Sequence, residues 1–327
     1  MWGQKVVRHF ALGYHYNRTG SEYGGCNRVQ ANLSETWMSR QIPLDDDVRA
    51  DHIEDGGTHE VAPDLAYKRL FLVNVVFAGF KDAGDQRWVL VDAGIPGSAG
   101  LIARAAAERF GKNARPAAIV MTHGHFDHVG ALKSLAEMWD VPIYAHPHEH
   151  PYLNGESYPP ADPSVGGGLM AAMSRLFPRG PVDVRRWLRA LPDDGSVPGM
   201  PGWRWIPTPG HTPGHISLWR DADRTVIAGD AFITTKQESA YAVATQRPEL
   251  HGPPQYYTPD WEAAKLSVRR LAALQPDVAI TMHGHAMRGD EMTSALSLLA
   301  SDFDTIAVPE HGRYVHRATL EGQADAT

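Results

Sequence analysis

The sequence predicts an α+β domain in which β-strands and helices alternate between about residue 66 and residue 310. Two kinds of pattern support this prediction. Short apolar runs of strand length, such as 117–122, contain no charged residue. Other stretches, such as 98–110, repeat their apolar residues at helical spacing. With 327 residues, 43% of them hydrophobic, the chain can bury one large core.

The elements follow one another with recognisable boundaries. Ser98 is a favourable N-terminal cap for the first helix, and Gly111 is a favourable residue to end it. Gly84 lies in the turn between the first two strands. In chain order, the patterns predict strands at 70–78 and 87–92, a helix at 98–110, a strand at 117–122, and helices at 129–138, 260–274 and 289–303.

Six residues in the middle of the chain, His123-Gly124-His125-Phe126-Asp127-His128, carry four side chains of metal-ligand types. Imidazole nitrogen and carboxylate oxygen suit zinc and similar divalent ions. Because a run of this density offers more donors than one tetrahedral ion uses, it indicates two neighbouring metal ions. The run follows the strand expected at 117–122, and open α/β sheets place their ligand sites at the carboxyl ends of strands.

Further candidate ligands follow other apolar runs. His211 lies in a loop rich in proline and glycine, and Asp230 ends the run Thr225-Val226-Ile227-Ala228-Gly229. Asp92 closes a strand in the same way. His283 competes with His285 for a place after the run at 278–281, and the Gly-His spacing favours His285.

Other histidines receive no metal-binding role. His215 follows a glycine turn and opens a strand, which favours a structural role. His146, His148 and His150 follow the short strand at 142–145 and are interpreted as loop histidines.

Taken together, these motifs resemble the metallo-β-lactamase-fold hydrolase superfamily. The segments occur in the order of that family: Val91-Asp92-Ala93-Gly94, Thr122 to His128, Pro209-Gly210-His211-Thr212-Pro213-Gly214-His215, Gly229-Asp230 and Gly284-His285. The resemblance covers about residues 70 to 290. It implies an αββα sandwich, in which two mixed β-sheets are flanked by helices.

The resemblance also implies a ligand set for two divalent ions, with Zn²⁺ as the first choice and Mn²⁺ or Fe²⁺ as alternatives. Asp230 would bridge the two ions, and Asp92 would orient ligands through hydrogen bonds. The implied ligands are His123, His125 and His211 for one ion and Asp127, His128 and His285 for the other.

The implied activity is hydrolysis of an ester, lactone or thioester by a hydroxide between the two ions, with Asp127 as the catalytic residue that receives or guides a proton. The carboxylate at Asp230 argues against β-lactam hydrolysis. The tyrosine that lactonases of this fold carry shortly after the bridging Asp is absent here, although Tyr241, Tyr256 and Tyr257 stay open as substitutes. The alternatives are an oxidoreductase of the persulfide dioxygenase type with one iron, and a phosphodiesterase.

The composition limits the kinds of partner that the chain is expected to bind. A net charge of −7 argues against a nucleic-acid surface, which relies on clustered Lys and Arg. No apolar stretch is long enough to span a membrane, and the start of the chain does not read as a signal peptide. The single cysteine, Cys26, fits a reducing cytoplasm. A small-molecule substrate is expected, for a monomer or a homodimer.

The chain is expected to be organised around one catalytic domain at 66–310. Residues 1–65 are expected to form a loop-rich arm that packs on this domain, and 311–327 a C-terminal tail. An insert at about 151–200, rich in proline and glycine, is typical of a segment that covers an active site. The side chains expected to contact the substrate are Met173, Phe177 and Trp187, together with Leu169 and Met170 as further lid residues, and Phe232 beyond the insert.

Overall fold

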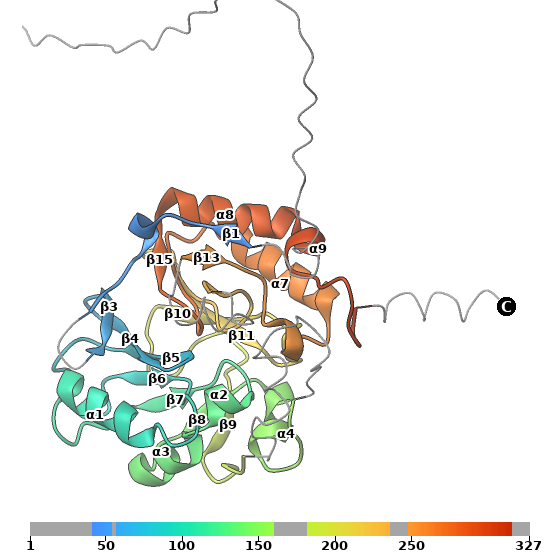
Figure 1. The fold of residues 1–327 in the computed structure, drawn as a ribbon. Coiled ribbons are helices and arrows are strands. Elements are labelled where there is room, and N and C mark those ends of the chain that lie inside the picture. The colour runs from blue at the N-terminus through green and yellow to red at the C-terminus, as the bar shows by residue number, and fades with distance from the viewer. Residues whose placement is uncertain (1–40, 54–56, 160–181, 236–247, 316–327) are drawn as a thin grey trace, which may run out of the picture. The chain divides into compact units, whose positions relative to one another are not determined.

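The computed structural model describes residues 41–53, 57–159, 182–235 and 248–315. In these residues two mixed β-sheets pack against each other and helices cover their outer faces, so the predicted αββα sandwich is confirmed (Figure 1). One sheet has eight strands and the other has five.

The eight-stranded sheet takes its strands in sequence order. The strands β6 to β9 pair in parallel, and the strands before them pair antiparallel. The strands are β2 (His52–Ile53), β3 (His59–Ala62), β4 (Leu65–Leu70), β5 (Val73–Ala78), β6 (Val89–Val91), β7 (Ala118–Val120), β8 (Ile143–Ala145) and β9 (Leu188–Ala190).

The five-stranded sheet contains one parallel pair, β12 with β14, among antiparallel neighbours. Its strands are β10 (Trp203–Pro207), β11 (Ile216–Arg220), β12 (Thr225–Ile227), β14 (Val278–Ile280) and β15 (Met287–Arg288). Separately, β1 (Ile42–Pro43) pairs with β13 (Glu249–Leu250).

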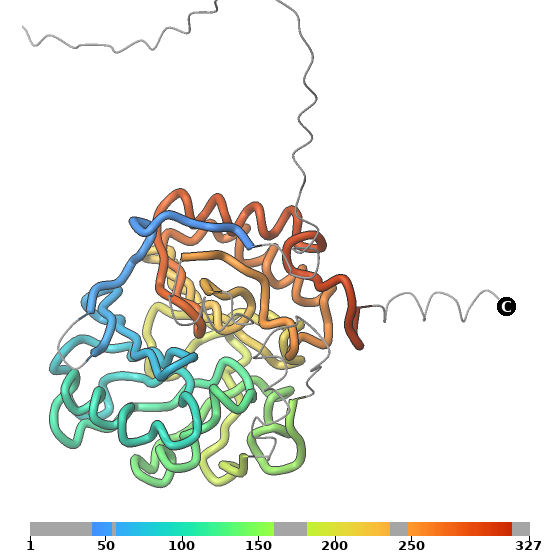
Figure 2. Tube along the Cα trace, viewed as in Figure 1, coloured from blue at the N-terminus to red at the C-terminus, as the bar shows by residue number. Residues whose placement is uncertain are grey.

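The helices lie outside the two sheets. The trace in Figure 2 shows the green helices beside the first sheet and the orange and red helices beyond the second. The α-helices are α1 (Ala99–Phe110), α2 (Phe126–Val129), α3 (Leu132–Trp139), α4 (His150–Leu153), α7 (Trp261–Ala273), α8 (Gly289–Ser301) and α9 (Phe303–Ile306). The 3-10 helices are η1 (Asp46–Val48), η3 (Pro147–Glu149) and η5 (Gln255–Tyr257).

Two apolar clusters hold these layers together. The larger one joins the eight-stranded sheet to α1 and α3 and extends between the two sheets, where Ile216 and Leu218 meet it. The smaller one joins the five-stranded sheet to α7 and α8. Burial of this apolar surface is the main source of stability, and it fixes the strand ends from which the candidate ligands extend.

Two boundaries and one helix cap differ from the sequence-based expectation. Strands β1, β2 and β3 already lie before residue 66, so the described part of the expected arm contributes to sheets. The expected helix at 129–138 is interrupted after Val129, because the backbone N–H of Gly130 donates to Gly94 O at 2.7 Å. Ser98 precedes α1 as expected, but its hydroxyl donates to Ile95 O and accepts no capping hydrogen bond from the helix backbone. Among the described helices, none has the length and apolar character that crossing a membrane requires.

Candidate metal centre

Four loops bring the candidate ligands to one edge of the sandwich. His123 and His125 follow β7, and His211 lies between β10 and β11. Asp230 follows β12, and His283 follows β14. Since β6 and β7 run parallel in one sheet, and β12 and β14 in the other, their carboxyl ends present these loops together.

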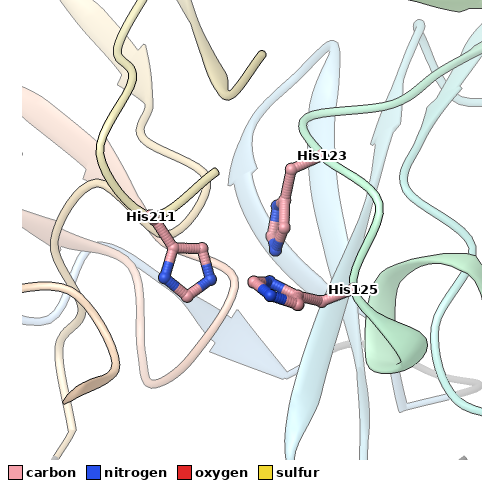
Figure 3. A group of neighbouring side chains, drawn as sticks. All are labelled: His123, His125 and His211. Carbon is pink, nitrogen blue, oxygen red and sulfur yellow. The ribbon is translucent and has the colours of Figure 1, made fainter. Parts of the chain in front are cut away.

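The first group of ligands is His123, His125 and His211. Figure 3 shows their three rings turned toward a common point. The centroid of the His123 ring lies 4.8 Å from those of His125 and His211, and the last two are 4.5 Å apart. All three side chains are buried, and each offers a nitrogen within 4.8 Å of the others. Three converging imidazoles form a suitable donor set for a divalent transition metal.

The second group is Asp127, His128 and His283. Asp127 Oδ2 lies 3.5 Å from His283 Nε2, and Asp127 Oδ1 lies 3.8 Å from His128 Nε2. These three side chains are also buried and close enough to share an ion. The structure therefore brings together all the ligands inferred from the run at 123–128.

Asp230 joins the two groups. Its Oδ2 atom lies near the Nε2 atoms of one pair of histidines from each group: 3.4 Å from His211 and 4.0 Å from His123, and 3.2 Å from His283 and 3.5 Å from His128. A carboxylate in this position can bridge two metal ions.

Hydrogen bonds at the Nδ1 atoms orient four of the histidines. Thr122 Oγ1 donates to Asp92, so it accepts from His123, and Thr258 Oγ1 donates to Pro254 O, so it accepts from His211. The Nδ1 contacts are His123 to Thr122 Oγ1 (3.0 Å), His128 to Asp92 Oδ2 (2.8 Å), His211 to Thr258 Oγ1 (3.2 Å) and His283 to Leu72 O (2.7 Å). Such contacts leave each Nε2 atom available for a metal, which is how metal-binding histidines are usually held.

The unpartnered atoms test whether a metal fits. Within the described part of the chain, buried atoms without a hydrogen-bond partner include the Nε2 atoms of His123 and His128, both ring nitrogens of His125, and Asp230 Oδ1. Buried polar atoms are normally hydrogen-bonded, and leaving them unpaired costs free energy. Since the ligand atoms of each group lie close together and near Asp230, bound cations would supply missing partners, and the residues fit two metal ions.

The charges in the site agree with this interpretation. Burial opposes ionisation of Asp230, but His283 and His128 lower its pKa well below the usual value. Burial works against the charged forms of His128 and His283 too, yet Asp230 and Asp127 raise their pKa values. Without a metal, protons on histidines thus compensate the carboxylates, and metal binding would replace those protons.

Asp92 and His215 contact the ligands and their loops from outside the two ligand groups. Asp92 accepts hydrogen bonds from the backbone N–H and hydroxyl of Thr122, both at 2.7 Å, as well as from His128. His215 Nε2 accepts from the backbone N–H of Asp230 at 2.9 Å, and its Nδ1 donates to Thr208 O at 3.0 Å. Burial lowers the pKa of His215 to about 3, so the ring is neutral.

The position given to His285 needs correction, because His283 lies beside Asp127, His128 and Asp230. His285 instead contacts Asp51, with its Nδ1 at 3.3 Å from Asp51 Oδ2. Gly284, which separates the two histidines, has φ of +103°, a conformation that L side chains rarely adopt. This turn sends the two imidazoles to different places.

Two of the side chains expected to contact the substrate, Phe232 and Trp187, lie in the described residues and pack on the apolar cores. Phe232 is fully buried in the core beside α7 and α8. Trp187 packs on the larger core, and its Nε1 donates to Asp140 Oδ1 at 2.7 Å. These contacts hold the side chain against the core and Asp140, which corrects the expectation that it lies over the site. Leu169, Met170, Met173 and Phe177 lie outside the described residues.

Several neighbours of the site were not found by sequence reasoning. Thr258 and the carbonyl of Leu72 orient His211 and His283, and the ring of Tyr257 lies 4.3 Å from that of His125. Glu149, within the loop histidines at 146–150, contacts the loops of His123 and His211. Of these residues, Tyr257 alone had been named from the sequence, as an open substitute for the missing lactonase tyrosine.

Comparisons with known proteins identify the family of the chain. A family model described as "Metallo-beta-lactamase superfamily" matches residues 69–283. The chain is 47% identical over 255 residues to the probable metallo-hydrolase YflN of Bacillus subtilis (strain 168), covering 78% of this chain and 96% of the relative. It is 27% identical over 182 residues to a hydroxyacylglutathione hydrolase of Bdellovibrio bacteriovorus, covering 52% and 60% of the two chains. A beta-lactamase domain protein from Burkholderia ambifaria has a similar structure, with a TM-score of 0.55, 21% identity, and 77% and 78% of the two chains covered.

Proposed function

Because this chain belongs to the metallo-beta-lactamase superfamily and is a probable metal-dependent hydrolase, we propose that it uses two divalent metal ions, zinc as first choice, to hydrolyse an ester, lactone or thioester. The observation that carries the proposal is the position of Asp230 Oδ2, which lies within 4.0 Å of Nε2 atoms from both ligand groups. One carboxylate placed in this way favours two ions over one.

The chemistry divides between the metals and the chain. Bound divalent ions would lower the pKa of a coordinated water and polarise the bond to be cleaved. Asp127 keeps two carboxylate oxygens at the centre, which suits it to hold a ligand position and to receive a proton. Asp92 keeps the Nδ1 proton on His128, and Leu72 O does the same for His283, so both rings direct Nε2 toward Asp230, where a metal would bind.

The bond type is inferred from three features. The ligand set contains the carboxylate of Asp230, which by resemblance argues against β-lactam hydrolysis. The hydroxyacylglutathione hydrolase of Bdellovibrio bacteriovorus supports cleavage of an acyl bond. A net charge of −7 disfavours a polyanionic phosphodiester substrate.

The test combines metal analysis with a substrate screen. Protein purified without added metal should contain two metal ions per chain. In a screen that also contains phosphodiesters, it should hydrolyse at least one lactone, thioester or aryl ester with zinc, manganese or iron. Asp127→Asn should abolish that hydrolysis and leave the fold intact, as judged by circular dichroism, whereas Asp85→Asn, an exposed matched control, should not change it. One iron per chain with oxygen uptake, or activity toward phosphodiesters alone, would refute the proposal.

A further inference from the structure

Glu149 is a buried carboxyl that lies between two of the ligand loops. Its side chain is fully inaccessible to solvent. Oε2 accepts a hydrogen bond from the backbone N–H of Gly124 at 2.7 Å, and Oε1 accepts from Thr212 Oγ1 and the backbone N–H of Gly214, also at 2.7 Å. Gly124 stands between His123 and His125 in the sequence, and Thr212 follows His211. One side chain thus joins the two loops that carry the first ligand group.

Two glycines provide the space that Glu149 occupies. A Cβ atom on Gly214 would lie 2.8 Å from Glu149 Oε1 and from its backbone nitrogen. A Cβ atom on Gly124 would lie 2.7 Å from the Cβ atom of Tyr152 and 3.2 Å from Glu149 Oε2. Neither glycine is needed here for a left-handed φ, so their role is to permit close approach of the carboxyl.

The need for such a connection is greatest at His125. In the described residues, neither of its ring nitrogens has a hydrogen-bond partner, whereas the Nδ1 atoms of His123 and His211 contact threonine hydroxyls. The orientation of His125 therefore depends on its backbone and on ring packing, with Tyr257 at 4.3 Å between centroids. Gly124, whose backbone N–H donates to Glu149, is the residue immediately before His125.

We propose that Glu149 is a positioning residue for the metal ion held by His123, His125 and His211, because it fixes the two loops that present them. The inference rests on the proposed function in that it requires a metal at this group. A carboxyl is an unfavourable group for filling space alone, since burial penalises its charge and an apolar side chain would fill the same volume. Its three hydrogen bonds to both loops match a positioning role.

Glu149→Gln is the informative change, because it keeps the shape and removes one acceptor. However the amide is turned, its NH₂ group faces either the N–H of Gly124 or the N–H of Gly214, and that donor loses its partner. To isolate the first ligand group, the measurement is made in a His283→Ala background, which disrupts the second. Zinc affinity is measured by competition with a chromogenic chelator.

Glu149→Gln should weaken zinc binding in this background by about 10-fold to 100-fold, the range expected when support of a ligand is lost. Glu60→Gln is the matched control. Glu60 is a mostly buried carboxylate that pairs with Arg109 and not with a ligand loop, so its change should lower the melting temperature and leave zinc affinity within about 2-fold. If Glu149→Gln also lowered only the melting temperature, the proposal would be overturned.

Thr212→Val provides a second route in case the Gln variant does not fold. It removes one of the three hydrogen bonds and keeps the carboxyl, so zinc affinity should fall by a smaller factor, and unchanged affinity would contradict the proposal. The titration uses no substrate, so failure of the hydrolysis screen would count against the proposed function alone. Absence of zinc binding by the unsubstituted protein would overturn both.

Discussion

Two clusters in this protein both contain histidine and aspartate side chains, but the distances between their nitrogen and oxygen atoms differ. The metal-centre cluster consists of His123, His125, Asp127, His128, His211, Asp230 and His283. The Asp51 network consists of Asp51, His59, Tyr67 and His285. In the first, oxygen and nitrogen atoms lie 3.2 to 4.0 Å apart. In the second, Asp51 Oδ2 is 2.5 Å from His59 Nδ1 and 2.8 Å from Tyr67 Oη.

The short distances from Asp51 Oδ2 to His59 and Tyr67 distinguish the two clusters, whereas the 3.3 Å distance to His285 Nδ1 does not. Two donors on one tetrahedral zinc, each about 2.0 to 2.1 Å from it, are about 3.3 Å apart, whereas hydrogen-bonded partners approach to below about 3 Å. Arg69 also places a guanidinium nitrogen 3.5 Å from His285 Nε2, which disfavours a cation there. Burial opposes ionisation of Asp51, but hydrogen bonds from His285, His59 and Tyr67 lower its pKa well below the usual value. In the Asp51 network the contacts gather on Asp51 Oδ2, whereas Asp51 Oδ1 is buried without a hydrogen-bond partner in the described residues, so residue type alone does not identify a metal site.

Substitution of the two neighbouring histidines should separate the clusters most strongly. His283→Ala should reduce the metal content from two ions to one and lower hydrolysis by more than about 100-fold, the upper end of the effect of losing an outer-shell partner. His285→Ala should keep both ions and destabilise the fold by only about 1 kcal/mol, the value of one hydrogen bond. Elemental analysis together with kcat/KM checks both expectations. Loss of a metal from the His285 variant instead would mean that the clusters are assigned the wrong way round.

Loss of the central carboxylate of the Asp51 network should affect stability and not metal binding. Asp51→Asn weakens the hydrogen bonds from His59 and Tyr67, and bonds to a charged partner contribute about 1.5 to 3 kcal/mol each. The free energy of unfolding, measured with urea on metal-free protein, should fall by about 2 to 3 kcal/mol. Two metal ions should still bind to the loaded protein. Asp85→Asn, which weakens an exposed ion pair with Arg115, should leave the free energy of unfolding almost unchanged.

Asp92 lies outside the metal-centre cluster and should give an intermediate effect on it. Asp92→Asn removes the charge that holds His128 Nδ1 and the two donors of Thr122, so zinc affinity should fall by about 10-fold to 100-fold. Thr258→Val removes a single neutral partner of His211 and should reduce affinity less. Isothermal titration of both variants gives the order. An equal or larger loss in the threonine variant would contradict the role assigned to Asp92.

The sequence could predict those parts of the site that are local in the chain. The run at 123–128 contains four side chains of ligand types within one turn, and Asp92 and Asp230 follow apolar runs that can be recognised in the sequence. His283 was misplaced because the spacing does not show the φ of +103° at Gly284. Asp51 and Glu149 were missed for another reason. Asp51 meets His285 across 234 positions and Glu149 meets Gly214 across 65, so their partners are set by the packing of the two sheets.

The smallest predicted effect concerns the pH dependence of Glu149, a buried carboxyl that faces Asp92 and Tyr152 as its charged and titratable neighbours. Burial raises the pKa of Glu149 from 4.5 to about 7, and hydrogen bonds from Thr212, Gly214 and Gly124 oppose that rise. A raised carboxyl pKa adds stability that is complete below 4.5 and is lost as pH rises through about 7. Metal-free protein should therefore lose about 1 kcal/mol relative to Glu149→Gln between pH 6 and pH 8. Urea unfolding of both proteins at each pH measures the difference, in which the titration of the site histidines cancels. The prediction is wrong if the free energy of unfolding of the unsubstituted protein, relative to that of Glu149→Gln, stays constant or rises with pH. The carboxyl would then be ionised throughout, as Asp51 is in its own network.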